Sequence, residues 1–174
     1  MTEVGGVDKN CRLLYYLLMR KCLVTGSFDP ITLGHMDIIE KALGVFDEVS
    51  VAVLVNPDRY PLFTDEQRVA MIQAVYGDRV NAFCFDGLAV DAAKAIGATH
   101  LVRGIRDEAD LAYETEMADF NRVHGLETVF FLSDPRLRGV SATKAREGLM
   151  SGADHNFIDE GVYALATEYL EERS

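Results

Sequence analysis

Short apolar runs alternate with segments of helical spacing along most of this 174-residue chain. The run at residues 49–55 is rich in β-branched side chains and apolar on both faces, as a central parallel strand should be. Before it, Met36, Ile39 and Leu43 follow the i, i+3, i+7 spacing of a helix with one core-facing side. This alternation favours a parallel sheet with right-handed crossovers. We therefore predict one α/β domain built on a doubly wound, five-stranded parallel sheet.

The positions of caps and glycines set the expected boundaries of the elements. Thr64 and Gln67 form a capping-box pattern, and Gly97 and Gly125 end two helical segments. The expected strands cover residues 22–25, 49–55, 80–85, 99–102 and 128–132. The expected helices cover residues 32–44, 88–96, 107–124, 141–150 and 159–171, with one more beginning at Thr64.

A glycine-flanked turn, Gly-Ser-Phe-Asp-Pro-Ile-Thr-Leu-Gly-His at residues 26–35, joins the first strand to the first helix. Free N–H groups at a helix start bind anions, and glycine lets a phosphate approach closely. His35 adds a donor that can be cationic near neutral pH. A lone histidine at a helix start is more often a cap or a packing residue, but this turn favours a role in binding.

Basic residues follow the ends of several expected strands. Arg59 lies in the loop after the second strand, and Arg103 and Arg106 flank a glycine directly after the fourth. Because the carboxyl ends of parallel strands meet at one rim, we expect these groups to converge there. Four more cations surround the predicted helix cap Ser141: Arg136, Arg138, Lys144 and Arg146. The alternative for all of these basic residues is that they are solvated at the surface of the protein.

Bulk properties exclude several classes of protein. The net charge of −11 argues against non-specific nucleic-acid binding, and no apolar run approaches the roughly 20 residues that cross a bilayer. Three scattered cysteines without C-x-x-C spacing indicate reduced thiols in a cytosolic compartment. The four histidines are dispersed, which argues against a metal site made by the protein.

The first 18 residues stand apart from the rest. We divide the chain into an N-terminal extension at 1–18 and a domain at 19–174. The alternative is that the extension forms an extra element packed on the core.

Arg103 with Arg106, and the cations around Ser141, form two candidate phosphate subsites that face His35. This arrangement indicates phosphoryl or nucleotidyl transfer. Charge neutralisation and in-line alignment of the reacting groups provide most of the catalysis of such a reaction. An attacking phosphate is already ionised, so the lack of a convincing general base in the sequence is consistent with a phosphate acceptor.

The turn at 26–35 resembles the G-x-F-D-P-x-T-x-G-H signature of the nucleotidylyltransferase superfamily. Three further stretches narrow the resemblance to the bacterial phosphopantetheine adenylyltransferase family, over about residues 20–170. These are Pro-Leu-Phe-Thr-Asp-Glu-Gln-Arg at 61–68, Val-Arg-Gly-Ile-Arg at 102–106, and Asp-Leu-Ala-Tyr-Glu at 110–114 leading to Met117 and Asn121. The resemblance implies a Rossmann-like nucleotidylyltransferase fold.

The same resemblance implies an activity in coenzyme A biosynthesis. Members of the family transfer the AMP moiety of ATP to 4′-phosphopantetheine, with Mg²⁺, by direct in-line attack. The products are dephospho-coenzyme A and pyrophosphate. A cytoplasmic homohexamer inhibited by coenzyme A is implied as well. Transfer to another phosphorylated acceptor, or a nucleotide-binding module without catalysis, remain as alternatives.

Residue roles follow from the resemblance too. His35 would stabilise the transition state, and no side chain of the protein would ligate a metal. Contacts to phosphopantetheine would come from Ser27, Arg59, Ala89 and Arg103. Contacts to ATP would come from Ser27, Phe28, His35, Gly104, Ile105, Arg106, Glu114, Leu137, Arg138, Gly139, Val140, Ser141, Ala142 and Thr143. The chain departs from the family pattern at Ser27, usually threonine, at Arg59, usually lysine, and at 140–143, usually I-S-S-S.

Overall fold

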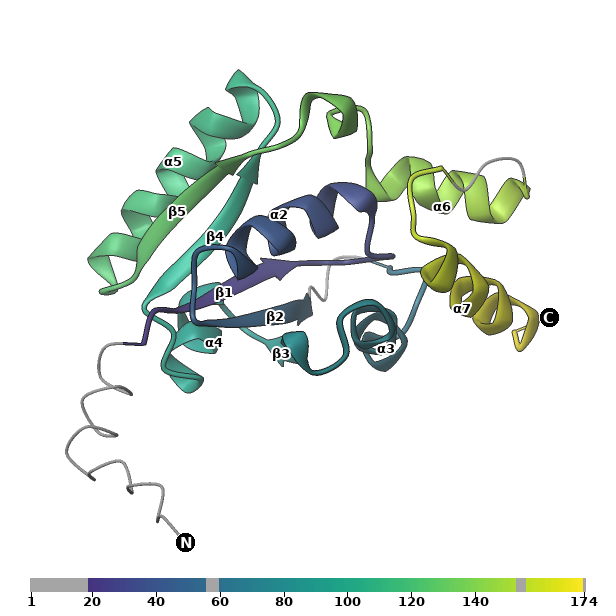
Figure 1. Cartoon of the computed structure of the whole chain (residues 1–174), viewed down its shortest axis with the longest axis horizontal. Coiled ribbons are helices and arrows are strands. Elements are labelled where there is room, and N and C mark those ends of the chain that lie inside the picture. Colours follow the sequence, from purple (N-terminus) through teal and green to yellow (C-terminus); the bar gives the residue numbers. More distant parts are fainter. Residues whose placement is uncertain (1–18, 56–59, 153–155, 174) are drawn as a thin grey trace, which may run out of the picture.

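The structure of this chain is a computed structural model that describes residues 19–55, 60–152 and 156–173. Five parallel strands form one sheet in the order β3-β2-β1-β4-β5, which confirms the predicted fold class (Figure 1). Residues 1–18, which we assign to an N-terminal extension, lie outside the described residues. The strands are β1 (Lys21–Gly26), β2 (Glu48–Val55), β3 (Asn81–Asp86), β4 (His100–Ile105) and β5 (Glu127–Leu132).

Helices cover both faces of the sheet, as in a doubly wound domain. On one face lie α2 (Leu33–Leu43) and α3 (Asp65–Tyr76), with α7 (Glu160–Glu171) packed against α3. On the other lie α4 (Ala89–Ala95) and α5 (Glu108–Val123). The remaining elements are α6 (Ala142–Ser151) and two short 3₁₀ turns, η1 (Gly77–Arg79) and η2 (Pro135–Leu137).

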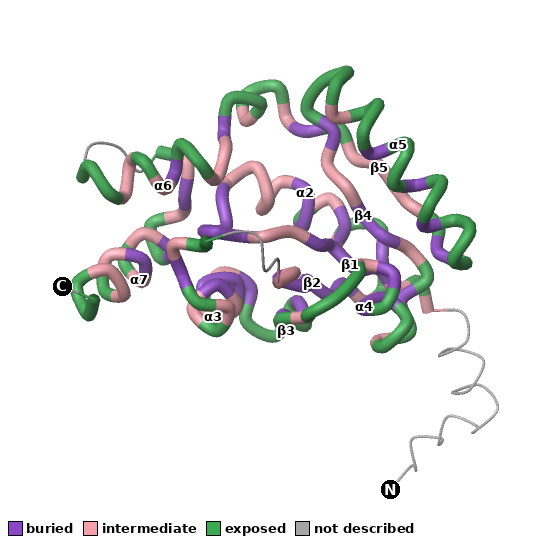
Figure 2. Tube along the Cα trace, turned by 180° about the vertical axis from the view of Figure 1, so that it is seen from behind, coloured by how far each residue is buried: buried purple, intermediate pink, exposed green. Residues whose placement is uncertain are grey.

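Burial follows the period-two pattern of the strands. In β1, Cys22 and Val24 pack into the core under α2, while Leu23 packs into a second core under α4. Figure 2 shows the central strands mostly buried and the outer sides of the helices exposed. Among the described helices, none combines the length and the apolar character needed to span a bilayer.

The fourth strand is longer than predicted. We expected it to end at Val102, with Arg103 in the following loop, but β4 continues to Ile105. The reason is its pairing with β5, which runs from His100↔Glu127 to Ile105↔Leu132. Arg103 therefore projects from a strand and not from a loop.

The sheet opens between β1 and β4. These two strands pair only as far as Val24↔Val102, although both continue beyond that point. The chain builds β2 and β3 on one side of β1 and then returns to place β4 on the other. Ligands of such sheets bind at this switch point, outside the carboxyl ends of the strands.

Candidate active site

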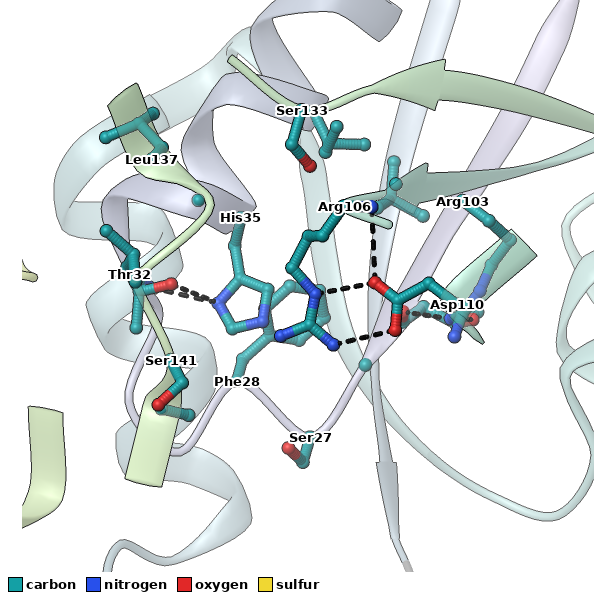
Figure 3. Close-up of a pocket in the computed structure, with 18 of the residues that line it drawn as sticks. Ser27, Phe28, Thr32, His35, Arg103, Arg106, Asp110, Ser133, Leu137 and Ser141 are labelled. Carbon is teal, nitrogen blue, oxygen red and sulfur yellow. Dashed lines mark hydrogen bonds and ion pairs between the residues drawn. The ribbon is translucent and has the colours of Figure 1, made fainter. Parts of the chain in front are cut away.

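A cavity of about 580 Å³ lies at the opening between β1 and β4. Its wall combines the turn after β1, the first turn of α2, the end of β4, one side of α5 and the start of α6. Figure 3 shows His35 near the middle of this group, with Thr32 on one side and Arg106 on the other. The structure thus brings together segments that are more than 100 residues apart.

The turn after β1 is shaped by the packing of Phe28. This residue is buried and adopts a positive φ of 45°. Its ring meets His35 edge-on, with ring centroids 5.0 Å apart. A Cβ on Gly26 would come within 3.2 Å of the Phe28 ring, which explains a glycine at the end of β1. The turn is therefore a packed support for the histidine.

His35 takes part in the N-terminal cap of α2. The backbone N–H of Thr32 donates to His35 Nδ1 at 3.0 Å, and Thr32 Oγ1 lies 3.0 Å from the same nitrogen. Histidine here serves the purpose that Glu or Gln has in a capping box. Since Nδ1 accepts the backbone N–H, the ring proton of the neutral imidazole must be on Nε2. His35 therefore offers the cavity an N–H donor of fixed direction.

The charge of His35 differs from our expectation. Burial, together with the nearby guanidinium groups of Arg103 and Arg106, lowers the pKa of His35 to about 4. The interpretation of His35 as a cation near neutral pH was therefore wrong. A neutral imidazole suits the capping contact because protonation of Nδ1 would remove the acceptor for Thr32.

Two arginines enter the cavity from β4 and the residue after it, and α5 holds both. Glu114 accepts from Arg103 Nε at 2.8 Å and from Arg103 Nη2 at 2.6 Å. Asp110 accepts from Arg106 Nε at 2.7 Å and from Arg106 Nη2 at 3.0 Å. The carboxylates are four residues apart and so lie on one side of the helix. Each arginine is thus fixed through a two-point contact.

Gly104, between the two arginines, allows the close approach of α2. A Cβ at this position would lie 2.7 Å from Ile38 Cγ1 and 2.9 Å from Ile38 Cδ1. A side chain there would push apart β4 and the helix that bears His35.

The start of α6 forms the opposite wall. Ser141 caps the helix by accepting from the backbone N–H of Lys144 at 3.2 Å. Arg146, on the same helix, donates to the backbone oxygen of Asp29 at 2.8 Å and to Thr143 Oγ1 at 3.2 Å. A helix N-terminus with a nearby guanidinium group is suited to phosphates.

Comparisons with known proteins agree with this geometry. Residues 23–148 match the family model described as cytidylyltransferase-like. A phosphopantetheine adenylyltransferase of Beijerinckia indica is 45% identical over 153 residues, which are 83% of this chain and 92% of the relative. One from Porphyromonas gingivalis is 42% identical over 143 residues, 80% of this chain and 94% of the relative. The chain belongs to the phosphopantetheine adenylyltransferase family.

Solved structures support the fold of this family member at low sequence identity. A bifunctional NMN adenylyltransferase/ADP ribose pyrophosphatase from Francisella tularensis matches with a TM-score of 0.67 at 18% identity, over 88% of this chain and 50% of that one. A nicotinic acid mononucleotide adenylyltransferase from Plasmodium falciparum matches with a TM-score of 0.60 at 15% identity, over 86% and 95% of the two chains.

Most residues predicted from the phosphopantetheine adenylyltransferase family line the cavity. Arg59 lies outside the described residues, and Ala89 packs on α4 against the second core. Ile105 is buried, and Arg138 and Gly139 are exposed beside the cavity without lining it. The predicted residues that do line it are Ser27, Phe28, His35, Arg103, Gly104, Arg106, Glu114, Leu137, Val140, Ser141, Ala142 and Thr143.

Other cavity residues were missed as site residues. Thr25, Asp110 and Ser133 line the cavity. Arg146, one of the cations predicted around Ser141, lines it as well. The spacing of Arg106 and Asp110 is a helical i, i+4 signal that could have found one pair. Thr25 had no signal of its own, because its contact depends on where β1 and β4 separate.

We expect His35 to stay uncharged at physiological pH. Its lowered pKa, near 4, means that the neutral form dominates above about pH 5. A group whose pKa falls on folding stabilises the fold above its unfolded value, near 6.5, and loses that contribution as the pH falls towards 4. NMR titration of the His35 ring protons measures the pKa directly. A midpoint near 6.5 would contradict the buried, capping role.

Proposed function

We propose that this chain transfers the adenylyl group of ATP to the phosphate of 4′-phosphopantetheine, giving dephospho-coenzyme A and pyrophosphate. The observation that carries this is the arrangement of His35: a fixed Nε2–H donor shares one cavity with two arginines, each held by a carboxylate of α5. Relatives at 42–45% identity bear the name of this activity.

The reaction is an in-line displacement. An oxygen of the acceptor phosphate forms a bond to the α-phosphorus of ATP, and the bond from that phosphorus to the bridging oxygen breaks. The leaving group carries the electron pair away as pyrophosphate. Because the acceptor is already ionised, the protein need not remove a proton from it. Its tasks are alignment and stabilisation of charge.

His35 acts where negative charge develops. In the transition state the oxygens on the α-phosphorus gain charge, and the Nε2–H of His35 donates to one of them. A donor fixed in advance by Thr32 does not need to reorganise during the reaction. This role requires a neutral imidazole with its proton on Nε2, which is the form that the capping contact selects.

The two substrates use different cations. We assign the acceptor phosphate to Arg103 and to the hydroxyl of Ser27, and the phosphates of ATP to Arg106 and the N-terminus of α6. The predicted contacts of Arg59 and Ala89 with phosphopantetheine, and those of Ile105, Arg138 and Gly139 with ATP, remain proposals. Arginine offers a planar fork that matches phosphate oxygens at both places.

Mg²⁺ is proposed to enter with ATP. Among the described residues, no cluster of three or more acidic, histidine or cysteine side chains could hold a metal ion. Asp110 and Glu114, both on the cavity wall, are already bonded to arginines. We therefore assign the ion to the phosphates of ATP and not to side chains of the protein, a common arrangement for Mg²⁺. It would neutralise charge on those phosphates.

A cytoplasmic homohexamer is also part of the proposal. An apolar row on α5, formed by Tyr113, Met117 and Phe120, is exposed at helical spacing in the single chain. Such a face fits contact with a second copy of the chain. Light scattering should give a mass six times the 19.3 kDa of one chain, and a monomer mass would exclude this state.

The activity can be tested with a panel of acceptors. We expect pyrophosphate release from ATP with 4′-phosphopantetheine, with a product of the mass of dephospho-coenzyme A, and little release when Mg²⁺ is omitted. Nicotinamide mononucleotide and glycerol 3-phosphate serve as comparison acceptors. Release with one of these but not with phosphopantetheine would replace the proposed acceptor. No release with any of them would favour a binding module.

A further inference from the structure

Arg103 is held from two sides before any substrate is present. Glu114 accepts from Nε and Nη2 on one side. On the other, Nη1 donates to the backbone oxygen of Thr25 at 2.8 Å and lies 3.1 Å from Thr25 Oγ1. The Glu114 side chain is only 9% exposed, against 30% for Arg103. The guanidinium group therefore reaches the cavity from a largely buried anchor.

The contact with Thr25 arises from the separation of β1 and β4. Thr25 and Arg103 each follow the last paired residues of these strands, Val24 and Val102. Beyond this point the backbone oxygen of Thr25 has no ladder partner on β4. The Arg103 side chain reaches back across the opening and supplies the missing donor. A buried carbonyl group needs such a partner.

The contacts also determine which part of Arg103 remains for a ligand. A guanidinium group has one edge formed by Nε and Nη2 and another formed by Nη1 and Nη2. Glu114 occupies the first edge. Thr25 accepts from Nη1, so one N–H on Nη2 and one on Nη1 are left to form a fork for a phosphate when both oxygens of Thr25 share a single hydrogen of Nη1.

We propose that Thr25 and Glu114 are positioning residues that hold Arg103 with its Nη1–Nη2 edge towards the phosphate of the acceptor. This inference rests on the function proposed above. It also gives Glu114 a different task from the ATP contact that the family resemblance implies, because both of its carboxylate oxygens accept from Arg103. The threonine hydroxyl contributes to affinity for the acceptor through the arginine and not through the substrate.

The hydroxyl of Thr25 can be removed with little change in shape. Thr25→Val is expected to raise the KM for 4′-phosphopantetheine roughly three- to tenfold, the range for one lost hydrogen bond. The kcat and the KM for ATP should stay within about twofold, and Thr25→Ser should restore the KM. Thr99→Val makes the same chemical change at the exposed start of β4 and is the matched control.

A second pair of variants separates the role of Arg103 from that of Arg106. Glu114→Gln leaves one acceptor for Arg103 and should raise the KM for phosphopantetheine roughly tenfold or more. Asp110→Asn weakens the matching contact of Arg106 and should raise the KM for ATP instead. An increase in the KM for ATP alone with Glu114→Gln would overturn the proposal in favour of a direct ATP contact.

A double-mutant cycle tests whether Thr25 acts through Arg103. In an Arg103→Lys background, Thr25→Val should have little further effect on the KM for phosphopantetheine. A full additional effect would mean that the hydroxyl contacts the substrate directly, which would overturn the proposal. Melting temperatures of all variants identify those that lose structure.

Calorimetric titration with 4′-phosphopantetheine separates this inference from the proposed activity. If the wild-type chain binds the compound without turnover, the activity fails but the positioning role is still measured by the weaker binding of Thr25→Val. Equal binding by Thr25→Val and the wild type, or no binding by the wild type, would overturn the positioning role.

Discussion

His35→Ala is expected to lower kcat by about 10²- to 10³-fold, the usual cost of removing one donor to a developing negative charge. The KM values for both substrates should change little. The reason is that the Nε2–H bond is made mainly in the transition state, so its loss affects kcat and kcat/KM together. Steady-state kinetics of pyrophosphate release measure both quantities. A rise in KM at unchanged kcat would refute the role.

His35→Asn separates catalysis from capping. The amide oxygen of asparagine can take the position of Nδ1 and accept the backbone N–H of Thr32, but asparagine has no counterpart of Nε2. We therefore expect this variant to lose as much kcat as His35→Ala while keeping the cap. The alanine variant should lose about 1 kcal/mol for the cap as well, roughly 2–4 °C in melting temperature. His100→Asn, at the opposite end of β4, is the distant control.

The element order was predictable because local signals agreed with the fold. Residues 49–55 carry a pattern of burial on both faces, and Thr64 and Gln67 form the capping box that the structure contains. The end of β4 was not predictable in the same way. Arginine and glycine have weak strand preferences, so Arg103 and Gly104 looked like a loop. Pairing with Phe130 and Phe131 of β5, which is a tertiary effect, keeps them in the strand.

The site shows a similar division between local and tertiary information. The turn at 26–35 and the two arginines could be named from sequence, because glycine and basic residues at strand ends are local features. The charge of His35 could not, since its pKa depends on burial and on two guanidinium groups that arrive from β4. The partners of Arg103 were hidden for the same reason. Thr25 is 78 residues away in the chain, and it meets Arg103 only because the strands separate.

Asp29→Ala is expected to cause the largest loss of stability among single changes near the site. The Asp29 side chain is 5% exposed, and its two oxygens accept from the backbone N–H groups of Leu62 at 2.9 Å and Phe63 at 3.0 Å. Alanine would leave both donors without this acceptor. Each buried group left unpaired costs about 1–3 kcal/mol. The melting temperature should fall by roughly 5–15 °C for a chain of this size.

The loss should extend to activity because Asp29 joins three distant segments. It belongs to the turn that carries Ser27 and Phe28, it binds the loop before α3, and its backbone oxygen accepts from Arg146 of α6 at 2.8 Å. Arg68 of α3, itself buried, donates to the backbone oxygen of Ser27 at 2.7 Å and reinforces the same junction. Freeing the loop would loosen the turn on which His35 packs. Below the melting temperature, kcat should therefore fall in Asp29→Ala.

A graded pair of variants tests this explanation. Asp29→Asn keeps an oxygen for one backbone N–H but turns an amide N–H group towards the other, so its melting temperature should lie between those of the wild type and Asp29→Ala. Asp78→Ala removes an exposed carboxylate from η1 and should change the free energy of unfolding by no more than about 0.5 kcal/mol. Thermal unfolding followed by circular dichroism gives all four values. A melting temperature of Asp29→Ala within 2 °C of the wild type would contradict this explanation. The contacts of Asp29 with Leu62 and Phe63 would then not hold the turn to α3. The packing of Phe28 and the hydrogen bond from Arg68 would have to stabilise the turn instead.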